Sequence, residues 1–316
     1  MNTGGHLAVR APGDPGALAL STAVVEAALE SARWSAVTVL AERSVAELFA
    51  GLPWAGRVRA VDGDGEGIAW RAVAPQAALL LDGRVRTAWH ALRARIPLRA
   101  GLAGGLRGAL LTHAVSPPRC AARRLPVPPA HLQRDLAGLL DLAVGARPPR
   151  LRPSPGDGLR AAEALAVAGL EPGAPYFVAW ADARPDGSRA PHPSTVEALV
   201  ELADRLGPGG VVLEGARTLG QPPPGPAAYV PVGADLALAS ALVAGARLAL
   251  CEGDGARWIA ASHGVGCLRL LAPDAPPAPA GFPERSRVLR RDEGRAHRAA
   301  LIEAAEGLLA DREEGG

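Results

Sequence analysis

Two glycine-bearing turns, each placed between an apolar run and a helical stretch, hold the residues best suited to chemistry. The first turn, Pro12–Gly16, follows the apolar run His6–Arg10 and precedes the helical stretch Ala17–Leu29. In an open parallel sheet, the carboxyl ends of the strands face the ligand crevice, and helix N-termini there favour anions. Asp14 is therefore a candidate base toward a sugar hydroxyl. Because Asp in a Pro/Gly turn commonly caps the next helix, a purely structural role stays open.

The second turn lies in the segment Leu250–Val265, which again combines an apolar run, glycines and a short helical stretch. Its backbone amides would cradle a diphosphate, and its arginine would add positive charge. The predicted diphosphate-binding residues are Gly253, Asp254, Gly255, Ala256 and Arg257.

A polar loop at residues 181–193 is a third candidate. It follows an apolar run and carries Arg184, Arg189 and His192, which suit a nucleotide phosphate but equally suit a solvated loop. The histidines of the chain show no HxxxH or HxH spacing, so we predict no metal site and no cofactor.

Positive charge is distributed unevenly. The sequence contains no Lys, so Arg must carry any anion binding. Residues 83–134 include ten Arg and no Asp or Glu. A block of one sign this long is either a solvated surface or a docking surface for an anionic partner.

Length and composition indicate a globular protein with two domains. The chain has 316 residues, 48% of them hydrophobic. Its three cysteines form no CxxC pair, which fits a reducing compartment. No signal peptide is evident, and the longest apolar stretch, Leu236–Cys251, contains Arg247 and is too short to span a bilayer. We expect a cytoplasmic protein.

Strand-like and helical segments alternate along the chain, which is typical of an α/β fold with doubly wound sheets. The expected strands are continuous apolar runs: His6–Arg10, Ala36–Leu40, Arg57–Val61, Ala77–Leu81, Tyr176–Trp180, Val211–Leu213, Leu248–Cys251 and Leu268–Leu271. The expected helices are Ala17–Leu29, Ser44–Ala50, Val85–Ala94, Leu132–Leu142, Ser194–Leu206, Leu236–Ala244, Trp258–His263 and Arg295–Leu309. A proline-rich linker at 147–157 divides the chain into Rossmann-like domains at 1–150 and 151–316.

Several of these segments resemble glycosyltransferase family 9, the ADP-heptose–lipopolysaccharide heptosyltransferases. The resemblance covers nearly the full length. Leu7–Thr22, Leu79–Trp89 and Arg95–Val115 are similar to segments of the family's N-terminal domain. Val211–Gly215 and Glu252–Gly264 are similar in shape to its donor-site segments.

This resemblance implies a GT-B fold, in which two Rossmann-like domains face a cleft, and the last helix packs back on the N-terminal domain. It implies inverting transfer of heptose from ADP-heptose to the phosphorylated inner core of lipopolysaccharide. The acceptor would be an anionic glycolipid at the inner membrane surface, where a peripheral position of the protein is the alternative to a purely cytoplasmic one. Nucleic acid is not expected, and the protein would be a monomer. The predicted roles are Asp14 as catalytic base, Gly13, Arg84, Arg86 and Arg99 at the acceptor, and Arg189 with residues 253–257 at the donor.

The sequence also departs from the family at chemical positions. The family's Gly-Asp pair before the first helix is Gly16-Ala17 here, and a donor-segment His is replaced by Trp258. The family's phosphate-binding Lys has Arg189 as its nearest cationic substitute. Two alternatives therefore stay open: an inactive relative that binds a nucleotide sugar or a protein as a scaffold, and a nucleotide-sugar epimerase of the same fold.

Overall fold

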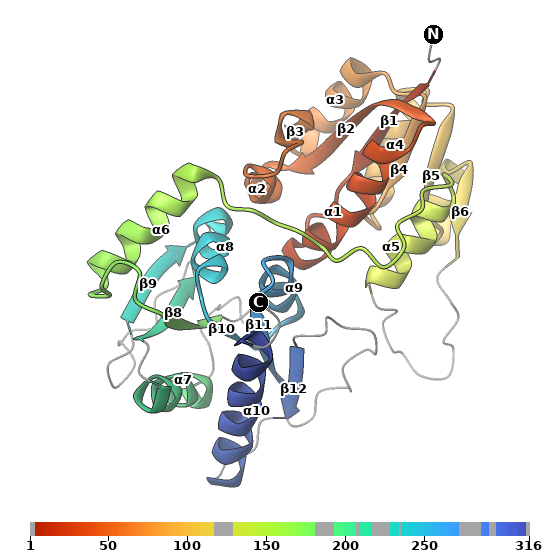
Figure 1. Cartoon of the computed structure of the whole chain (residues 1–316). Helices are drawn as coiled ribbons and strands as arrows, with labels where there is room; N and C mark the ends of the chain where they lie inside the picture. The colour runs from red at the N-terminus through yellow and green to blue at the C-terminus, as the bar shows by residue number, and fades with distance from the viewer. Residues whose placement is uncertain are drawn as a thin grey trace. The chain divides into compact units, whose positions relative to one another are not determined.

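The computed structural model describes residues 4–116, 129–180, 193–206, 209–215, 228–233, 235–271, 286–290 and 295–313 (Figure 1). The chain forms two compact units, one running to Arg150 and the other beginning at Leu151. Each unit contains a six-stranded sheet, and all described strand pairs are parallel. The predicted α/β class is therefore confirmed.

The sheet of the N-terminal unit has the strand order β3-β2-β1-β4-β5-β6. Its strands are β1 (Gly5–Arg10), β2 (Trp34–Glu42), β3 (Val58–Val61), β4 (Ala77–Leu80), β5 (Leu98–Leu102) and β6 (His113–Val115). Its helices are α1 (Pro15–Glu30), α2 (Arg43–Ala46), α3 (Glu66–Val73), α4 (Val85–Arg93) and α5 (Pro129–Gly138). Four short 3-10 turns are η1 (Glu47–Phe49), η2 (Ala55–Arg57), η3 (Gly63–Gly65) and η4 (Gly105–Leu110).

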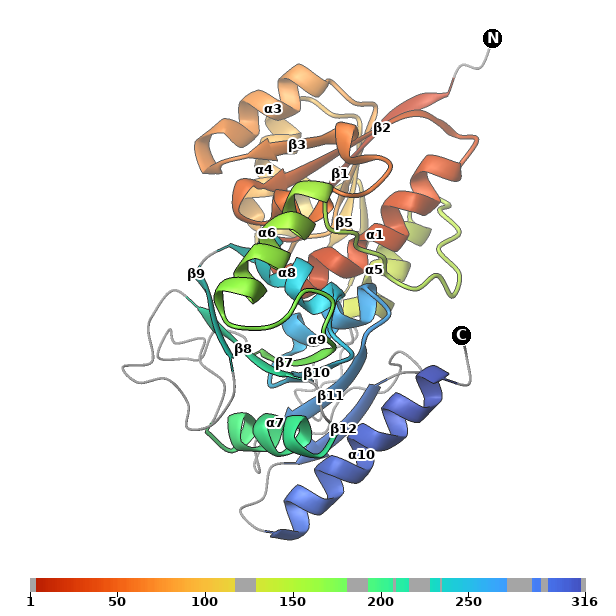
Figure 2. The same cartoon turned by 60° about the vertical axis from the view of Figure 1, so that its left-hand side comes forward.

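Helices cover both faces of this sheet, which explains why its central strands are continuous apolar runs. All four residues of β4 are buried. Helices α3 and α4 pack side by side on one face, where Trp70 is fully buried with Leu40 and Ile96. Helices α1 and α5 pack against each other on the opposite face (Figure 2).

The C-terminal unit repeats this plan, with the strand order β12-β11-β10-β7-β8-β9. Its strands are β7 (Tyr176–Trp180), β8 (Gly209–Gly215), β9 (Ala228–Gly233), β10 (Leu248–Cys251), β11 (Gly266–Leu271) and β12 (Ser286–Arg290). Its helices are α6 (Pro155–Val167), α7 (Pro193–Leu206), α8 (Leu236–Ala244), α9 (Asp254–Ser262) and α10 (Arg295–Glu313). None of the described helices is both long and apolar enough to cross a membrane.

The last helix packs on the sheet of its own unit. Leu301, Ile302 and Leu308 of α10 are buried in one core with Phe177 of β7 and Leu199 of α7. Its apolar face is covered by β10, β11 and α7. That this helix also packs back on the N-terminal domain, as the family resemblance implies, stays a prediction.

The strand order reverses once in each sheet, between β1 and β4 in the first and between β7 and β10 in the second. The loops that leave the carboxyl ends of two such strands diverge toward opposite faces and open a crevice, which is the usual ligand site of doubly wound sheets. Both glycine-bearing turns of the sequence lie at these positions, after β1 and after β10.

A buried histidine couples the stability of the C-terminal unit to pH. His263 directly follows α9, and its Nε2 lies 2.7 Å from Oγ of Ser240 on α8. Burial lowers the pKa of His263 to about 4 from its ordinary value of 6.5. The unfolded chain therefore binds this proton at higher pH than the folded chain, and stability falls as pH drops from about 6.5 to about 4.

We expect the wild-type protein to lose about 3 kcal/mol more unfolding free energy than His263→Gln when pH falls from about 7 to about 4. Urea unfolding of both proteins at a series of pH values measures this difference. If the unfolding free energies of the two proteins changed with pH in parallel, His263 would have the same pKa in the folded and unfolded chain.

Candidate functional site

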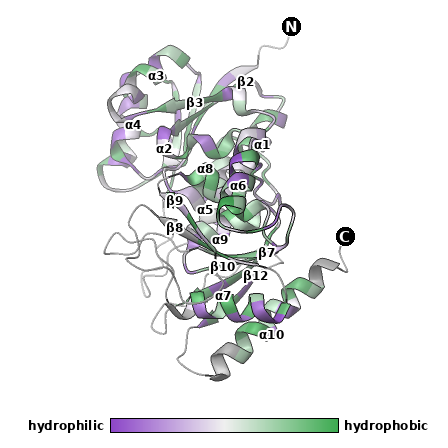
Figure 3. Cartoon of the chain, turned by 90° about the vertical axis from the view of Figure 1, so that its left-hand side faces the viewer, coloured by the Kyte–Doolittle hydropathy of each residue, from purple (hydrophilic) through white to green (hydrophobic). Residues whose placement is uncertain are grey.

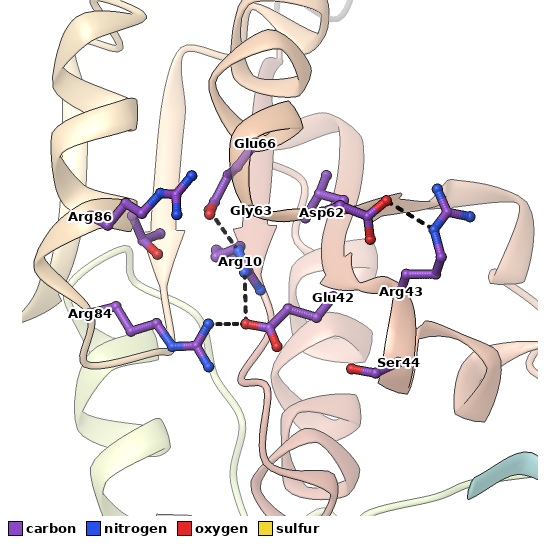
Figure 4. A pocket seen from close by; sticks show the side chains of 11 residues that line it. Arg10, Glu42, Arg43, Ser44, Asp62, Gly63, Glu66, Arg84 and Arg86 are labelled. Carbon is purple, nitrogen blue, oxygen red and sulfur yellow. Dashed lines mark hydrogen bonds and ion pairs between the residues drawn. The ribbon is translucent and has the colours of Figure 1, made fainter. Parts of the chain in front are cut away.

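A buried guanidinium group lies at the carboxyl end of β1. Arg10, the last residue of this strand, is 1% exposed. Its Nε donates to Glu66 Oε1 at 2.7 Å, and its Nη1 donates to the carbonyl oxygen of Ala11 at 2.6 Å. Its Nη2 lies 3.4 Å from Glu42 Oε1 (Figure 4). Burial lowers the pKa of Arg10, but the hydrogen bond to Glu66 and the charge of that carboxylate outweigh it, so the net pKa is raised.

The Glu42 carboxylate joins this guanidinium to two residues of the predicted acceptor site. Glu42 ends β2 and also forms an ion pair with Arg84, which follows β4. A Cβ atom at Gly13 would lie 2.7 Å from Oε2 of Glu42, so only glycine lets the carboxylate approach the backbone this closely. Gly13 and Arg84 therefore meet at Glu42, although 71 positions separate them.

A cavity of about 270 Å³ opens at this edge of the sheet. Arg43 and Asp62 form an ion pair at 3.0 Å on one side of it, and Arg86 of α4 lies on the other side (Figure 4). The lining carries four guanidinium groups and three carboxylates, namely Arg10, Arg43, Arg84, Arg86, Glu42, Asp62 and Glu66. The excess positive charge suits an anionic group such as a phosphate or a carboxylate.

A second buried acid fixes the loop that carries Arg84. Asp82 is 7% exposed and accepts a hydrogen bond from Thr87 Oγ1 at 2.6 Å. Arg107 Nη2 donates to the Asp82 carbonyl oxygen at 2.7 Å and lies 3.7 Å from its Oδ1. Burial raises the pKa of Asp82, while the Thr87 hydrogen bond and the charges of Arg10 and Arg107 oppose the shift.

The candidate base, Asp14, is the N-cap residue of α1. Its Oδ1 accepts a hydrogen bond from the Ala17 amide at 2.8 Å, and its side chain is exposed. The structure therefore gives Asp14 the helix-capping role that sequence reasoning left open. Capping occupies one carboxylate oxygen, and no hydrogen bond from the described residues reaches Oδ2.

The structure does not bring Arg99 to this cavity. Arg99 is the second residue of β5 and pairs in register with Ala78, near the amino end of β4. Its guanidinium group donates to the carbonyl oxygens of Ile96 and Leu110. The cavity lies at the carboxyl ends of the strands, so Arg99 sits at the opposite end of the sheet.

In the C-terminal unit, the N-terminus of α9 follows β10 at the second strand-order reversal. Gly253 is its N-cap residue, so no side chain caps the helix there. Asp254 Oδ1 lies 3.0 Å from Nη2 of Arg257 and 3.1 Å from Nη2 of Arg269. Two guanidinium groups thus share one carboxylate, and this excess positive charge adds to the helix dipole to favour an anion.

The two arginines of this cluster lie beneath the turn and not on its surface. Arg257 is 1% exposed and Arg269 is 8% exposed, whereas Asp254 is about half exposed. Burial lowers the pKa of Arg257, and the charge of Asp254 opposes this. A guanidinium group buried this deeply can influence an anion at the turn through its charge. Arg189 lies outside the described residues.

Sequence reasoning missed five charged residues of these sites: Arg10, Glu42, Glu66, Asp82 and Arg269. Arg269 stands inside the apolar strand β11, where its register with Cys251 places it beside the end of β10. The only sequence signal for four of them was a charged residue within or directly after an apolar run, and Glu66 had none. In the part of the chain that the structure describes, no group of three or more His, Cys, Asp or Glu could hold a metal ion.

No protein-family model and no curated protein matches the sequence. Solved structures do match over 98% of the chain. A glycosyltransferase family 9 protein from Veillonella parvula has 18% identity, 99% coverage of its own chain and a TM-score of 0.76. E. coli ADP-heptose lipopolysaccharide heptosyltransferase II has 19% identity, 99% coverage and a TM-score of 0.70. E. coli heptosyltransferase WaaC with ADP-2-deoxy-2-fluoro heptose has 15% identity, 100% coverage and a TM-score of 0.62.

The chain therefore has the GT-B fold of family 9 glycosyltransferases. The sequence resemblance to that family is confirmed at the level of the fold.

The buried pair of Arg10 and Glu66 gives a stability prediction. We expect Glu66→Ala to lower the unfolding free energy by about 3–5 kcal/mol, because it leaves a buried guanidinium poorly compensated. The double variant Arg10→Met/Glu66→Leu removes both charges and should lose much less. Asp62→Ala, which breaks the exposed pair with Arg43, is the control and should change stability by about 1 kcal/mol or less.

Denaturant unfolding of the four proteins measures these differences. A double variant as unstable as Glu66→Ala would contradict the role of charge burial.

Proposed function

We propose that this protein is an inverting glycosyltransferase that transfers heptose, or another sugar, from an ADP-heptose-like nucleotide sugar. The acceptor would be the lipopolysaccharide core or a related anionic glycan. One observation carries the proposal: Asp14, the arginine-lined cavity and the α9 N-terminus all lie at strand-order reversals of a fold shared with heptosyltransferases. One of these neighbours was solved with an ADP-heptose analogue.

The chemistry would be a single displacement at the anomeric carbon of the donor sugar. A bond forms between the acceptor oxygen and this carbon as the bond to the diphosphate oxygen breaks, and the bonding electron pair leaves with the diphosphate. Asp14 takes the proton of the acceptor hydroxyl. The first-turn amides of α9 at residues 253–256, with Arg257 below and Arg189, stabilise the leaving diphosphate.

The acceptor would bind through its negative charge. Gly13 keeps the Glu42 carboxylate close to the first loop, and Arg84 and Arg86 present guanidinium groups at the cavity. A phosphorylated sugar would pair with these groups by charge-assisted hydrogen bonds. Arg99 is left out of this site, because its guanidinium is engaged by carbonyl groups at the other end of the sheet.

A second candidate function is binding without turnover, as a nucleotide-sugar or protein scaffold. The observation in its favour is the engagement of Asp14 with the Ala17 amide, which gives this carboxylate a purely structural task. The two candidates differ in one measurable property, namely whether Asp14 is needed for product formation.

Asp14→Asn separates capping from catalysis. Asn caps helices as well as Asp does, so we expect unchanged stability, but the amide cannot accept the proton and turnover should fall about 10²–10⁴-fold. Asp14→Ala should in addition lose about 1 kcal/mol of stability. Asp235→Asn is the control for turnover, which it should leave intact: Asp235 caps α8 by accepting from the Leu238 amide at 2.9 Å, and it also forms an ion pair with Arg160.

Nucleotide release and thermal unfolding of these variants give the two readouts. Full turnover in Asp14→Asn would remove Asp14 as the base. Donor binding without turnover in the wild-type protein, with every acceptor tried, would favour the scaffold.

Donor binding is tested by calorimetric titration with ADP, ADP-heptose, UDP sugars and GDP sugars. We expect one adenine nucleotide to bind, and Arg189→Ala to weaken it about tenfold, because a charge-assisted hydrogen bond is lost. The control variant Arg57→Ala removes an exposed arginine of the N-terminal unit and should leave the nucleotide affinity unchanged. If none of the nucleotides binds, the proposed donor site is wrong.

A further inference from the structure

We infer that the outer surface formed by α3, α4 and η4, here called the α3–α4 surface, docks on an anionic lipid membrane. This goes beyond the proposed function, because it concerns where the protein binds and not what it catalyses. It rests on the proposed function only for the suggestion that the acceptor is anchored in the same membrane.

Exposed apolar side chains gather on this surface. Seven large hydrophobic residues are exposed in the described structure, and four of them lie here: Ile68 (64% exposed), Val85 (49%), Trp89 (47%) and Leu106 (83%). Helix α4 contacts both α3 and η4, so the three elements lie next to one another. Figure 3 labels α3 and α4 on their side of the N-terminal unit. Val85 and Trp89 are four residues apart on α4 and therefore point to the same side of the helix. Such a gathering indicates an interaction surface.

The charge of the α3–α4 surface has a single sign. Residues 67–116 contain one acidic residue, Asp82, which is buried and bound by Thr87. The exposed arginines of α3 and α4 are Arg71, Arg86 and Arg93, and the exposed Arg95 follows α4 by two residues. No carboxylate of residues 67–116 is therefore exposed beside these guanidinium groups, and the partner that fits them is anionic.

The combination of apolar and cationic side chains fits a bilayer surface. Tryptophan is enriched at the level of the lipid headgroups, and neighbouring aliphatic side chains insert into the acyl boundary. Arginines beside them contact anionic headgroups, each contributing about 1 kcal/mol near the surface.

The position of the surface also fits the acceptor proposed above. Arg86 belongs to α4 and lines the cavity at the carboxyl edge of the sheet. The α3–α4 surface thus reaches the rim of the proposed acceptor site. A glycolipid anchored in the bound membrane would present its anionic headgroup there.

Sedimentation with lipid vesicles tests the inference on the full chain. We expect binding to phosphatidylcholine vesicles that contain phosphatidylglycerol, little binding to phosphatidylcholine alone, and weaker binding at high salt. Val85→Ser/Trp89→Ser should weaken binding at least tenfold. Arg71→Ser/Arg93→Ser should weaken it about fivefold for each arginine at low salt.

Matched controls lie elsewhere on the chain. Leu159→Ser/Val167→Ser removes two exposed apolar side chains of α6, and Arg57→Ser/Arg59→Ser removes two exposed arginines at the start of β3. Both should bind vesicles like the wild-type protein. Circular dichroism and nucleotide titration of every variant show whether it is folded.

Binding that is equal on neutral and anionic vesicles, or equal in the α3–α4 variants and the wild type, would overturn the inference. The inference would also be overturned if the protein bound an acidic protein and did not bind vesicles. Turnover of a soluble, deacylated acceptor is measured in parallel. If the wild-type protein binds vesicles but does not turn over this acceptor, the result counts against the proposed function and leaves the membrane inference standing.

Discussion

The ion pair between Arg10 and Glu66 is the interaction on which the N-terminal site depends. A guanidinium group that is 1% exposed is tolerated only when carboxylates compensate its charge, and here they come from α3 and from the end of β2. The pair thereby fixes how α3 begins and where Glu42 points. Glu42 in turn holds Arg84 beside Gly13. One buried charge therefore positions three loops at the carboxyl edge of the sheet.

The two units place different chemical groups at the same position of their sheets. In both units the strand order reverses once, at the position where doubly wound sheets usually bind ligands. The N-terminal unit has a cavity there that is lined with side chains of both signs, which can select a particular arrangement of anionic and hydroxyl groups. The C-terminal unit has a helix N-terminus above two buried arginines and one carboxylate. Such an arrangement favours negative charge through the backbone amides and through the electric field of the helix and the arginines. Such a division suits a varied acceptor and a diphosphate donor.

The sequence predicted the central strands well because each is a continuous apolar run covered on both faces, as β1, β4 and β10 show. It missed α6, because a proline-rich stretch suggested only a linker, although Ser154 caps this helix and Pro155 begins it. It placed Asp14 and Arg84 at the correct strand ends. It missed the pairing of Arg10 with Glu66, since 56 positions separate these residues and only the sheet order brings them together.

The absence of lysine gives both sites a common property. Guanidinium groups stay protonated throughout the physiological range, and even burial, which lowers the pKa of Arg107 and Arg257, acts on a group whose ordinary pKa lies far above that range. The charge of the guanidinium groups at either strand-order reversal is therefore constant with pH. The ligand's own phosphate groups are then one source of any pH dependence of anion binding near neutrality. A phosphomonoester, whose second pKa is near 6, would bind more tightly as pH rises, whereas a nucleotide-sugar diphosphate would not.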